Sequence, residues 1–303
     1  MGKINILETP ENLIERMKKK NIKFNIMTEE NAIHFLEHNT YYKKITSYES
    51  NFHYSIKEGK KIYSNLDFAY LVELSRIDME FRFIVIQMCL NIEHALKVKA
   101  INICLDNRAD GYAIVEEYFN SQNEDVKGKI LKNANNSYCM DLVLQNQNKL
   151  PLWVMLEVVS FGDLCHFYQF LSKKGYVNCS ELDVIFKIRD LRNAAAHNHC
   201  LLSQIKSGDA KPIAKISQYV SGNDTIGRQE RKNRLSSRCI NDFVTLLYAF
   251  EYYIESEGII KHTKEEVEKL FVERMLKHKE YFSDCLTVKN AYSFVQKVID
   301  MWM

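Results

Sequence analysis

Hydrophobic residues recur along most of this chain at the three- and four-residue intervals of an α-helix. The longest such run covers residues 66–104, which contain no glycine or proline and place apolar residues on nearly every side. A helix that is apolar all round is normally buried in the centre of a bundle. The pattern therefore predicts one long central helix with shorter helices packed around it.

Two short helices are predicted near the beginning of the chain. Residues 11–38 fall into two helical stretches that are joined near residues 25–28. Thr28 precedes Glu29 and Glu30, and a threonine N-cap followed by acidic residues favours the start of a helix. We therefore expect the second helix to begin here.

Three further start signals lie in the middle of the chain. Pro151 can occupy the first turn of a helix, and Ser160 with Asp163 can cap the helix that follows. Ser180 is expected to begin a third helix, which has a regular apolar face. The residues of that face are Val184, Ile185, Ile188 and Leu191.

Composition supports an all-α fold. Ten glycines and three prolines among 303 residues are too few for a turn-rich β-fold. A last apolar helix over residues 235–254 completes the predicted bundle. We therefore predict an N-terminal helical segment over residues 1–60, a helical core over residues 61–255 and a C-terminal helical extension over residues 256–303.

The sequence also predicts a soluble, cytoplasmic protein. No apolar leader follows Met1, and no stretch reaches the roughly 18 uncharged apolar residues of a membrane span. The eight cysteines are scattered without a Cys-x-x-Cys pair, so we expect reduced thiols, no metal site and no cofactor. Because the net charge is only +2, any nucleic-acid surface must arise from local clustering of basic residues.

The segment over residues 189–199, RDLRNAAAHNH, carries the residues best suited to acid–base chemistry. Arg192 stays protonated at any working pH and offers a planar fork of donors to phosphate oxygens. An imidazole such as that of His197 has an ordinary pKa of about 6.5 and can accept or donate a proton. Cleavage of RNA by its own 2′-hydroxyl needs a base, an acid and cationic donors for the charged transition state. The segment therefore predicts half of a ribonuclease active site.

Helix geometry leaves the identity of the catalytic histidine open. An ideal helix separates Arg192 from His197 by about 140° and from His199 by about 20°. Geometry alone favours His199, although a long arginine side chain can reach His197 around a helix end lined by the small residues 194–196. A purely structural interpretation is that Arg192 pairs with a carboxylate and that His197 caps the helix.

Four blocks of sequence, in order, resemble the HEPN ribonucleases and, within them, the abortive-infection proteins of the AbiD and AbiF type. The blocks are Phe35-Leu36 with Tyr41-Tyr42-Lys43-Lys44 and Ser47-Tyr48; Asp78, Arg82 and Glu93; Pro151-Leu152-Trp153 with Glu157 and Ser160-Phe161-Gly162; and Arg192, the polar Asn193 and His197. Together they span residues 35–197. The resemblance implies an HEPN-like helical bundle in which Arg192, Asn193 and His197 are catalytic, with His199 as the alternative histidine.

The resemblance also implies an activity and its partners. It implies a metal-independent endoribonuclease toxin of an antiphage or toxin–antitoxin system, restrained by a small structured RNA. HEPN ribonucleases pair two such motifs, and we find no second convincing motif in this sequence, so the resemblance implies a homodimer in which Arg192 and His197 of both subunits face one cleft. The alternative function is a non-catalytic RNA-binding scaffold, which has no need for a histidine beside Arg192.

A polar stripe is predicted along the long central helix. Asp78, Arg82 and Glu93 fall within an arc of roughly 60° at about 100° per residue. One interpretation is a buried ion network, because buried charges must be paired and hydrogen-bonded. The other is that Glu93 or Arg82 supports the catalytic pair from a neighbouring helix.

A basic segment follows the motif. Its cations are Lys206, Lys211, Lys215, Arg228, Arg231, Lys232, Arg234 and Arg238, against three acidic residues. We interpret residues 206–238, which include three glycines, as a mobile loop that could hold an RNA backbone, although an ordinary solvated loop would look the same. A second candidate surface combines the cations over residues 16–23 with the tyrosines over residues 41–54, whose rings could stack on unpaired bases.

Overall fold

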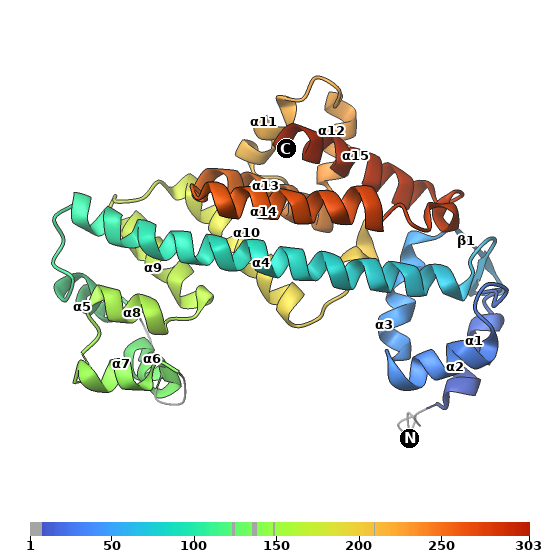
Figure 1. The fold of residues 1–303 in the computed structure, drawn as a ribbon, viewed down its shortest axis with the longest axis horizontal. Coiled ribbons are helices and arrows are strands. Elements are labelled where there is room, and N and C mark those ends of the chain that lie inside the picture. The colour runs from blue at the N-terminus through green and yellow to red at the C-terminus, as the bar shows by residue number, and fades with distance from the viewer. Residues whose placement is uncertain (1–7, 123–124, 135–137, 148, 209) are drawn as a thin grey trace. The chain divides into compact units, whose positions relative to one another are not determined.

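The fold is all-α, as the sequence predicts (Figure 1). The computed structural model describes residues 8–122, 125–134, 138–147, 149–208 and 210–303. Residues 1–7, for which the sequence predicts no apolar leader, and Asp209 of the basic segment lie outside the described residues. In the part of the chain that the structure describes, the only paired strands are β1 and β2, which form one antiparallel hairpin.

The elements follow one another along the chain with these bounds. The strands are β1 (Tyr54–Lys57) and β2 (Lys60–Tyr63), and the helices are α1 (Pro10–Lys18), α2 (Glu29–His38), α3 (Tyr42–Thr46), α4 (Phe68–Asp106), α5 (Ala113–Asn120), α6 (Val126–Ala134), α7 (Met140–Gln145), α8 (Leu152–Val158), α9 (Phe161–Lys173), α10 (Cys179–Ala196), α11 (Ala214–Ser221), α12 (Arg228–Leu235), α13 (Arg238–Tyr253), α14 (Glu257–Glu268) and α15 (Leu286–Trp302). Short turns of other helix types are η1 (Ser47–Asn51), η2 (Leu201–Gln204), the π-helical η3 (Lys269–Arg274) and η4 (Lys279–Phe282).

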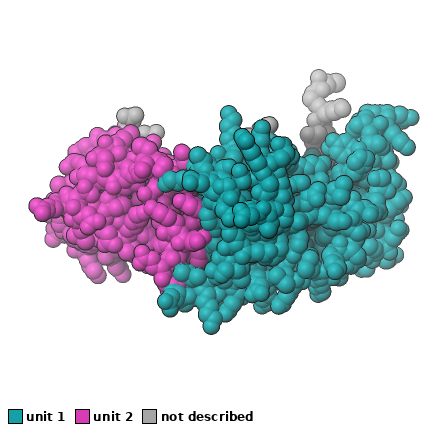
Figure 2. Space-filling view, turned by 90° about the horizontal axis from the view of Figure 1, so that it is seen from above, with its two compact units in different colours: residues 1–86, 194–247, 257–303 teal, residues 87–193, 248–256 magenta. Residues whose placement is uncertain are grey.

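The chain divides into two compact units (Figure 2). Unit 1 comprises Met1–Ile86, Ala194–Leu247 and Glu257–Met303, and unit 2 comprises Gln87–Asn193 and Tyr248–Ser256. The boundaries fall within α4, α10 and α13, so each of these helices contributes residues to both units. The three consecutive segments expected from the sequence stay a prediction.

The long apolar helix is confirmed as α4, of 39 residues. Asp67 begins it, because one carboxylate oxygen accepts the Ala69 N–H at 2.9 Å while the other accepts the Asn25 N–H at 2.8 Å. Val85 and Ile92 are completely buried, as expected for a helix with apolar residues on several sides. The helix thus supplies core side chains to unit 1 through its first half and to unit 2 through its second.

The predicted helix starts are confirmed with small shifts. The Thr28 side chain accepts the Asn31 N–H at the start of α2. Ser160 and Asp163 form a reciprocal capping box at the start of α9, with each side chain accepting the other residue's N–H. The helix expected from Ser180 begins one residue earlier, where Asn178 accepts the Ser180 N–H at 3.0 Å. Its predicted inward face, residues 184–191, is buried at every apolar position named above.

The β-hairpin is an element that the helical pattern did not predict. Tyr54 pairs with Tyr63 across the two strands, and Tyr63 is buried. Glu58 and Gly59 form the turn with φ angles of 50° and 73°, the left-handed pair that a two-residue hairpin turn requires. The Glu-Gly dipeptide was the available signal, but strands of four residues are too short to show a clear alternation of polar and apolar residues.

The basic segment after the motif is largely helical, which corrects its interpretation from the sequence as a mobile loop. It folds into α11 and α12 and leads directly into α13. Gly222 follows α11 and Gly227 precedes α12, so these glycines mark helix ends. Ile216 and Leu235 are completely buried and anchor the two helices in unit 1.

Candidate active site

The predicted motif lies at the C-terminal end of α10. Arg192 and Asn193 occupy the last two turns of the helix, and His197 is the first residue beyond it. Asn198 adopts a left-handed φ of 56°, its N–H donates to Ala195 O at 3.0 Å, and the next N–H, of His199, donates to Ala194 O at 2.9 Å. These two bonds form a Schellman motif, in which an asparagine takes the position that glycine usually occupies. The backbone around His197 is therefore fixed by the helix end itself.

Arg192 has a defined charged environment within unit 2. Its side chain is 32% exposed, and one guanidinium nitrogen, Nη2, lies 3.9 Å from Glu93 Oε2. Its Nη1 donates to Asn193 Oδ1 at 3.1 Å. Glu93 Oε2 is buried and has no hydrogen-bond partner among the described residues, while Glu93 Oε1 lies 4.0 Å from Lys97 Nζ. The arginine is thus held by a carboxylate and an amide, and its remaining N–H donors retain capacity for an anion.

A second cation on α10, Arg189, lies one turn before Arg192 and was not singled out from the sequence. Its guanidinium donates to Asp190 Oδ1 at 2.7 Å and its carbon Cζ lies 4.6 Å above the Phe186 ring. The three-residue spacing of the two arginines, which puts them on neighbouring parts of one helix face, was the signal that could have identified it. Arg189 lies 2.7 Å from Asp190 and also contacts an aromatic ring, whereas Arg192 lies 3.9 Å from its carboxylate, so Arg192 is the better candidate for phosphate binding.

Both histidines expose their side chains in unit 1. The imidazole rings of His197 and His199 have centroids 6.1 Å apart. The carbonyl of His199 lies 3.5 Å from Arg82 Nη1, so its backbone is tied to α4. Either imidazole is accessible to a substrate, and the choice of His197 rests on the resemblance.

Asp78 and Arg82 form a buried ion pair that also fixes the segment after the motif. Asp78 Oδ2 accepts the hydroxyl of Tyr48 at 2.9 Å as well as the guanidinium of Arg82, and Asp78 Oδ1 accepts the backbone N–H of Leu202 at 2.7 Å. Burial raises the pKa of Asp78, opposed by the Leu202 N–H and Arg82, and burial also raises the pKa of Tyr48, which keeps its hydroxyl protonated. These two members of the polar stripe therefore form an ion network, whereas Glu93 contacts Arg192.

The basic residues that follow the motif are distributed over α12 and its flanks in unit 1. Arg228 and Lys232 are exposed, and Arg231 and Arg234 are half-buried. The other predicted RNA-binding residues, Lys206, Lys211 and Arg238, are exposed. Lys206 lies 6.0 Å from the centroid of the Tyr54 ring, and Arg238 lies 3.6 Å from Asp242.

In the second candidate surface, the cations over residues 16–23 are largely paired with acidic side chains. Lys18 forms ion pairs with Glu15 and Glu29, and Lys20 contacts Glu49 at 2.8 Å. Of the tyrosines beyond it, Tyr48 is completely buried and belongs to the core. These pairs leave α12 and its flanks as the stronger basic surface.

The described residues were expected to hold neither a metal site nor a membrane span. Within the described ranges, no group of three histidine, cysteine, aspartate or glutamate side chains is arranged to hold a metal ion. None of the helices that the structure describes combines the length and apolar character of a membrane span. All eight cysteines are free thiols.

The fold and the motif define an all-α protein with an arginine, an asparagine and exposed histidines at the end of one helix. The model of the Abi-like protein family matches residues 34–203, which include α4, α10 and the whole motif. The chain therefore belongs to the Abi-like family of abortive-infection proteins, and this membership indicates a role in abortive-infection defence. No curated protein and no solved structure matches the chain.

Proposed function

We propose that this chain is an endoribonuclease of the HEPN superfamily, of the AbiD or AbiF type, that acts as a toxin in antiphage defence. The observation that supports this most directly is the end of α10. There Arg192 and Asn193 lie within the last two turns and His197 stands exposed at the cap, inside the residues that match the abortive-infection family.

The residues have complementary roles in the proposed reaction. His197 accepts the proton of the RNA 2′-hydroxyl or donates one to the departing 5′-oxygen. Arg192 binds the phosphate oxygens, whose negative charge increases in the transition state. Asn193 and Glu93 hold the guanidinium in place. The products would carry a 2′,3′-cyclic phosphate and a 5′-hydroxyl, and no metal ion takes part.

A single motif per chain provides one arginine and one catalytic histidine, so the proposal includes a homodimer. The exposed side of α4 supports it, because it is apolar along most of its length. Its apolar positions are Met79, Phe83, Ile86, Leu90, Val98, Ile101 and Leu105, with His94 between Leu90 and Val98; Ile86 and Ile101 are half-buried and the others are exposed. Phe83 is 61% exposed and Leu105 is 66% exposed. A surface helix normally presents polar residues to water, and a long apolar stripe on its outer side marks a partner surface.

The spacing of this stripe indicates that the partner is a second copy of the chain. Successive positions are four, three, four, four, four, three and four residues apart, a series that reads the same in both directions. Two α4 helices crossing antiparallel at residue 92 would therefore place Phe83 opposite Ile101 of the second copy, and Leu90 opposite His94 of the second copy. Such a self-complementary patch is what a two-fold interface requires. Glu93, the partner of Arg192, lies next to this centre.

For RNA binding, we propose that the backbone lies along α12. Its sequence RQERKNRL supplies four cations, of which Arg228 and Lys232 are exposed. The one acidic residue of this helix, Glu230, is paired with Lys297 at 3.0 Å. A small structured RNA that restrains the toxin would use the same cations. A cytoplasmic location follows from this substrate and stays part of the proposal.

Mapping of RNA ends tests the proposed function. Purified protein should cleave RNA in the presence of EDTA, and the new 3′ ends should be sealed by a ligase that requires a 2′,3′-cyclic phosphate. His197→Ala should abolish these ends, whereas His199→Ala should retain them. Binding of RNA without any new ends in the wild-type protein would favour the scaffold function instead.

A further inference from the structure

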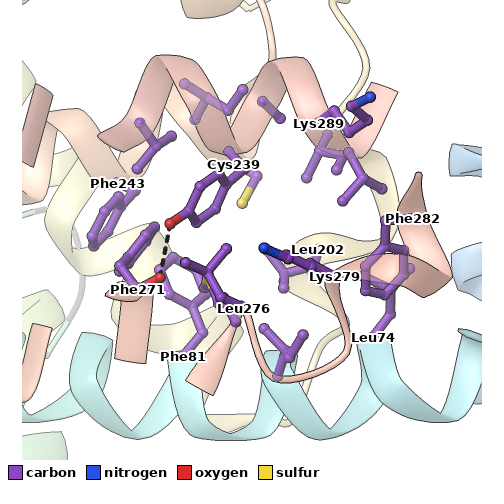
Figure 3. Close-up of a pocket in the computed structure, with 18 of the residues that line it drawn as sticks. Leu74, Phe81, Leu202, Cys239, Phe243, Phe271, Leu276, Lys279, Phe282 and Lys289 are labelled. Atoms are coloured by element: carbon purple, nitrogen blue, oxygen red, sulfur yellow. Dashed lines mark hydrogen bonds between the residues drawn. The ribbon is translucent and has the colours of Figure 1, made fainter. Parts of the chain in front are cut away.

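Unit 1 contains an apolar pocket with a volume of about 520 Å³ (Figure 3). Its walls come from the first half of α4, the segment around η2, the start of α13, and the residues from η3 to α15. Wall residues drawn in the figure include Leu74, Phe81, Leu202, Phe243, Phe271 and Phe282. Small-molecule sites typically measure about 300–1,000 Å³ and are lined mainly by apolar side chains with a few polar groups. The pocket has the size and lining of such a site.

The polar groups around the pocket leave one cation available to a ligand. Lys279 extends from η4 into the pocket, whereas the amine of Lys289 points away from it (Figure 3). Lys289 donates to Ser283 O at 3.2 Å, and Glu280, the acidic residue among the described lining residues, lies 3.3 Å from His278 Nδ1. No ion pair is found for Lys279 within the described part of the chain.

Of the remaining polar groups in the wall, those of Tyr292 and Cys239 are poor ligand partners, and Ser283 adds one hydroxyl. The hydroxyl of Tyr292 already donates to Phe271 O at 2.9 Å, as the dashed line in Figure 3 marks. Burial raises the pKa of the Cys239 thiol, so it stays a neutral, weak donor. A ligand with several polar groups would leave them without partners, at a cost in binding free energy. The pocket therefore suits a ligand that is apolar except at one end.

We propose that this pocket binds an amphiphile, an unbranched alkyl chain with a single anionic head group, whose head pairs with Lys279. The apolar walls bury the chain, and the lysine distinguishes an anion from an alcohol or a cation of the same length. The source of such a molecule is either a free fatty acid or a lipid of a membrane, which share this chemistry.

The bound chain would contact the segment that leaves the proposed active site. Leu202 and Ile205 line the pocket and follow His199 closely. The backbone N–H of Leu202 donates to Asp78 Oδ1 at 2.7 Å, so this wall is held by the buried Asp78–Arg82 pair. The binding site itself does not depend on the proposed ribonuclease activity and is tested without RNA.

Calorimetric titration of the full chain tests the proposal. Dodecanoate should bind with one site per chain and a negative heat-capacity change, because apolar surface is buried. Dodecan-1-ol and dodecyltrimethylammonium should bind at least fivefold more weakly. Lys279→Gln should remove this preference while leaving the affinity for dodecan-1-ol unchanged. The matched control is Lys277→Gln, because Lys277 is exposed and does not line the pocket.

A second variant and a second source complete the test. Ala291→Phe adds a ring to the pocket wall and should abolish binding of both the acid and the alcohol; its circular dichroism spectrum reports whether it folds. Flotation with vesicles that contain lysophosphatidylglycerol, which has one acyl chain and one anionic phosphate, tests a membrane lipid as the source. Binding to these vesicles that Lys279→Gln weakens indicates a membrane lipid, and binding of dodecanoate alone that the same variant weakens indicates a free acid. Equal affinity for all three dodecyl compounds, no saturable binding, or an equal loss in Lys277→Gln would overturn the proposal.

Discussion

Arg192 is the residue whose surroundings best support the proposed role in binding an anion. The buried Oε2 atom of Glu93 lies 3.9 Å from it, and Asn193 accepts a hydrogen bond from it at 3.1 Å. An arginine held at a fixed position can present its remaining donors to phosphate without first being ordered, which favours the transition state. Lysine cannot reproduce this planar arrangement.

Arg192→Lys should therefore lower kcat for RNA cleavage roughly 100-fold while the protein stays folded, because the charge is retained but the fork of donors is lost. Single-turnover rates at saturating RNA measure this. Arg189→Lys is the matched control on the same helix, and it should stay within about threefold of the wild type, since Arg189 is paired with Asp190. Equal losses in the two variants would argue against a specific role for Arg192.

Asp78→Asn should lower the free energy of unfolding by about 3 kcal/mol, because it leaves the buried Arg82 without its counter-charge. Urea denaturation measures the change. The control is Glu8→Gln, which breaks the exposed Glu8–Arg16 pair and should change the free energy by less than about 1 kcal/mol. A loss for Asp78→Asn as small as that of the control would show that the Asp78–Arg82 pair does not stabilise the fold.

At the scale of elements, the exposed stripe of α4 and the cations of α12 have different expected roles. The stripe is apolar and lies on the outer side of a helix whose other sides are buried, so it is suited to a protein partner. The α12 helix is strongly basic and is suited to a polyanion. Variants in each element should therefore change different measurements.

Leu90→Lys should convert the proposed dimer to a monomer and abolish RNA cleavage, because it places a charge near the centre of the two-fold contact. Sedimentation equilibrium and a cleavage assay measure the two effects. Leu286→Lys makes the same change at an exposed leucine outside the stripe, at 68% exposure, and should alter neither. A wild-type protein that is monomeric at micromolar concentration and retains its specific activity on dilution would contradict the dimer.

Replacing Arg231, Lys232 and Arg234 together by alanine should weaken RNA binding and flatten its dependence on salt. Each lost phosphate contact lowers the slope of log affinity against log salt by about one unit. Titrations of RNA binding at several salt concentrations measure the slope. The charge-matched control replaces the exposed Lys261, Lys269 and Lys277, and should leave it unchanged. The same slope in both triple variants would show that α12 is ordinary solvated surface.

At the scale of the whole molecule, the C-terminal residues belong to the core of unit 1. Phe294 and Val298 of α15 are completely buried, and Trp302 is 4% exposed. Arg274 links this segment to α4 through Glu73 at 2.5 Å and Glu80 at 2.7 Å. The last residues of the chain therefore contribute to the stability of unit 1.

Phe294→Ala should lower the free energy of unfolding of unit 1 by about 3 kcal/mol, because it removes a fully buried ring and leaves a cavity. Hydrogen exchange of amides in α13 and in the first half of α4 measures the effect within unit 1. Leu286→Ala, at an exposed position of the same helix, should change it by less than about 0.5 kcal/mol. Unchanged exchange in Phe294→Ala would mean that the C-terminal helix is independent of the core.

Much of the fold was predictable because its signals are local. Thr28, Ser160 and the apolar face of α10 act within one or two turns of helix, so capping residues and periodicity were enough to place these elements. The basic segment was misread as a loop because its glycines, taken alone, indicate flexibility. In the structure the residues beside those glycines form α11 and α12, which bury Ile216 and Leu235 in unit 1.

By itself, the sequence determined the all-α class, the long helix and the segment that contains Arg192 and His197, since each depends on neighbours along the chain. The tertiary structure alone decided that Asp78 contacts Tyr48 and Leu202, and that Glu93 lies beside Arg192. Glu93 and Arg192 are 99 positions apart. Contacts over such separations form where apolar faces pack together. The periodic pattern of one segment does not predict which distant residue that segment will contact.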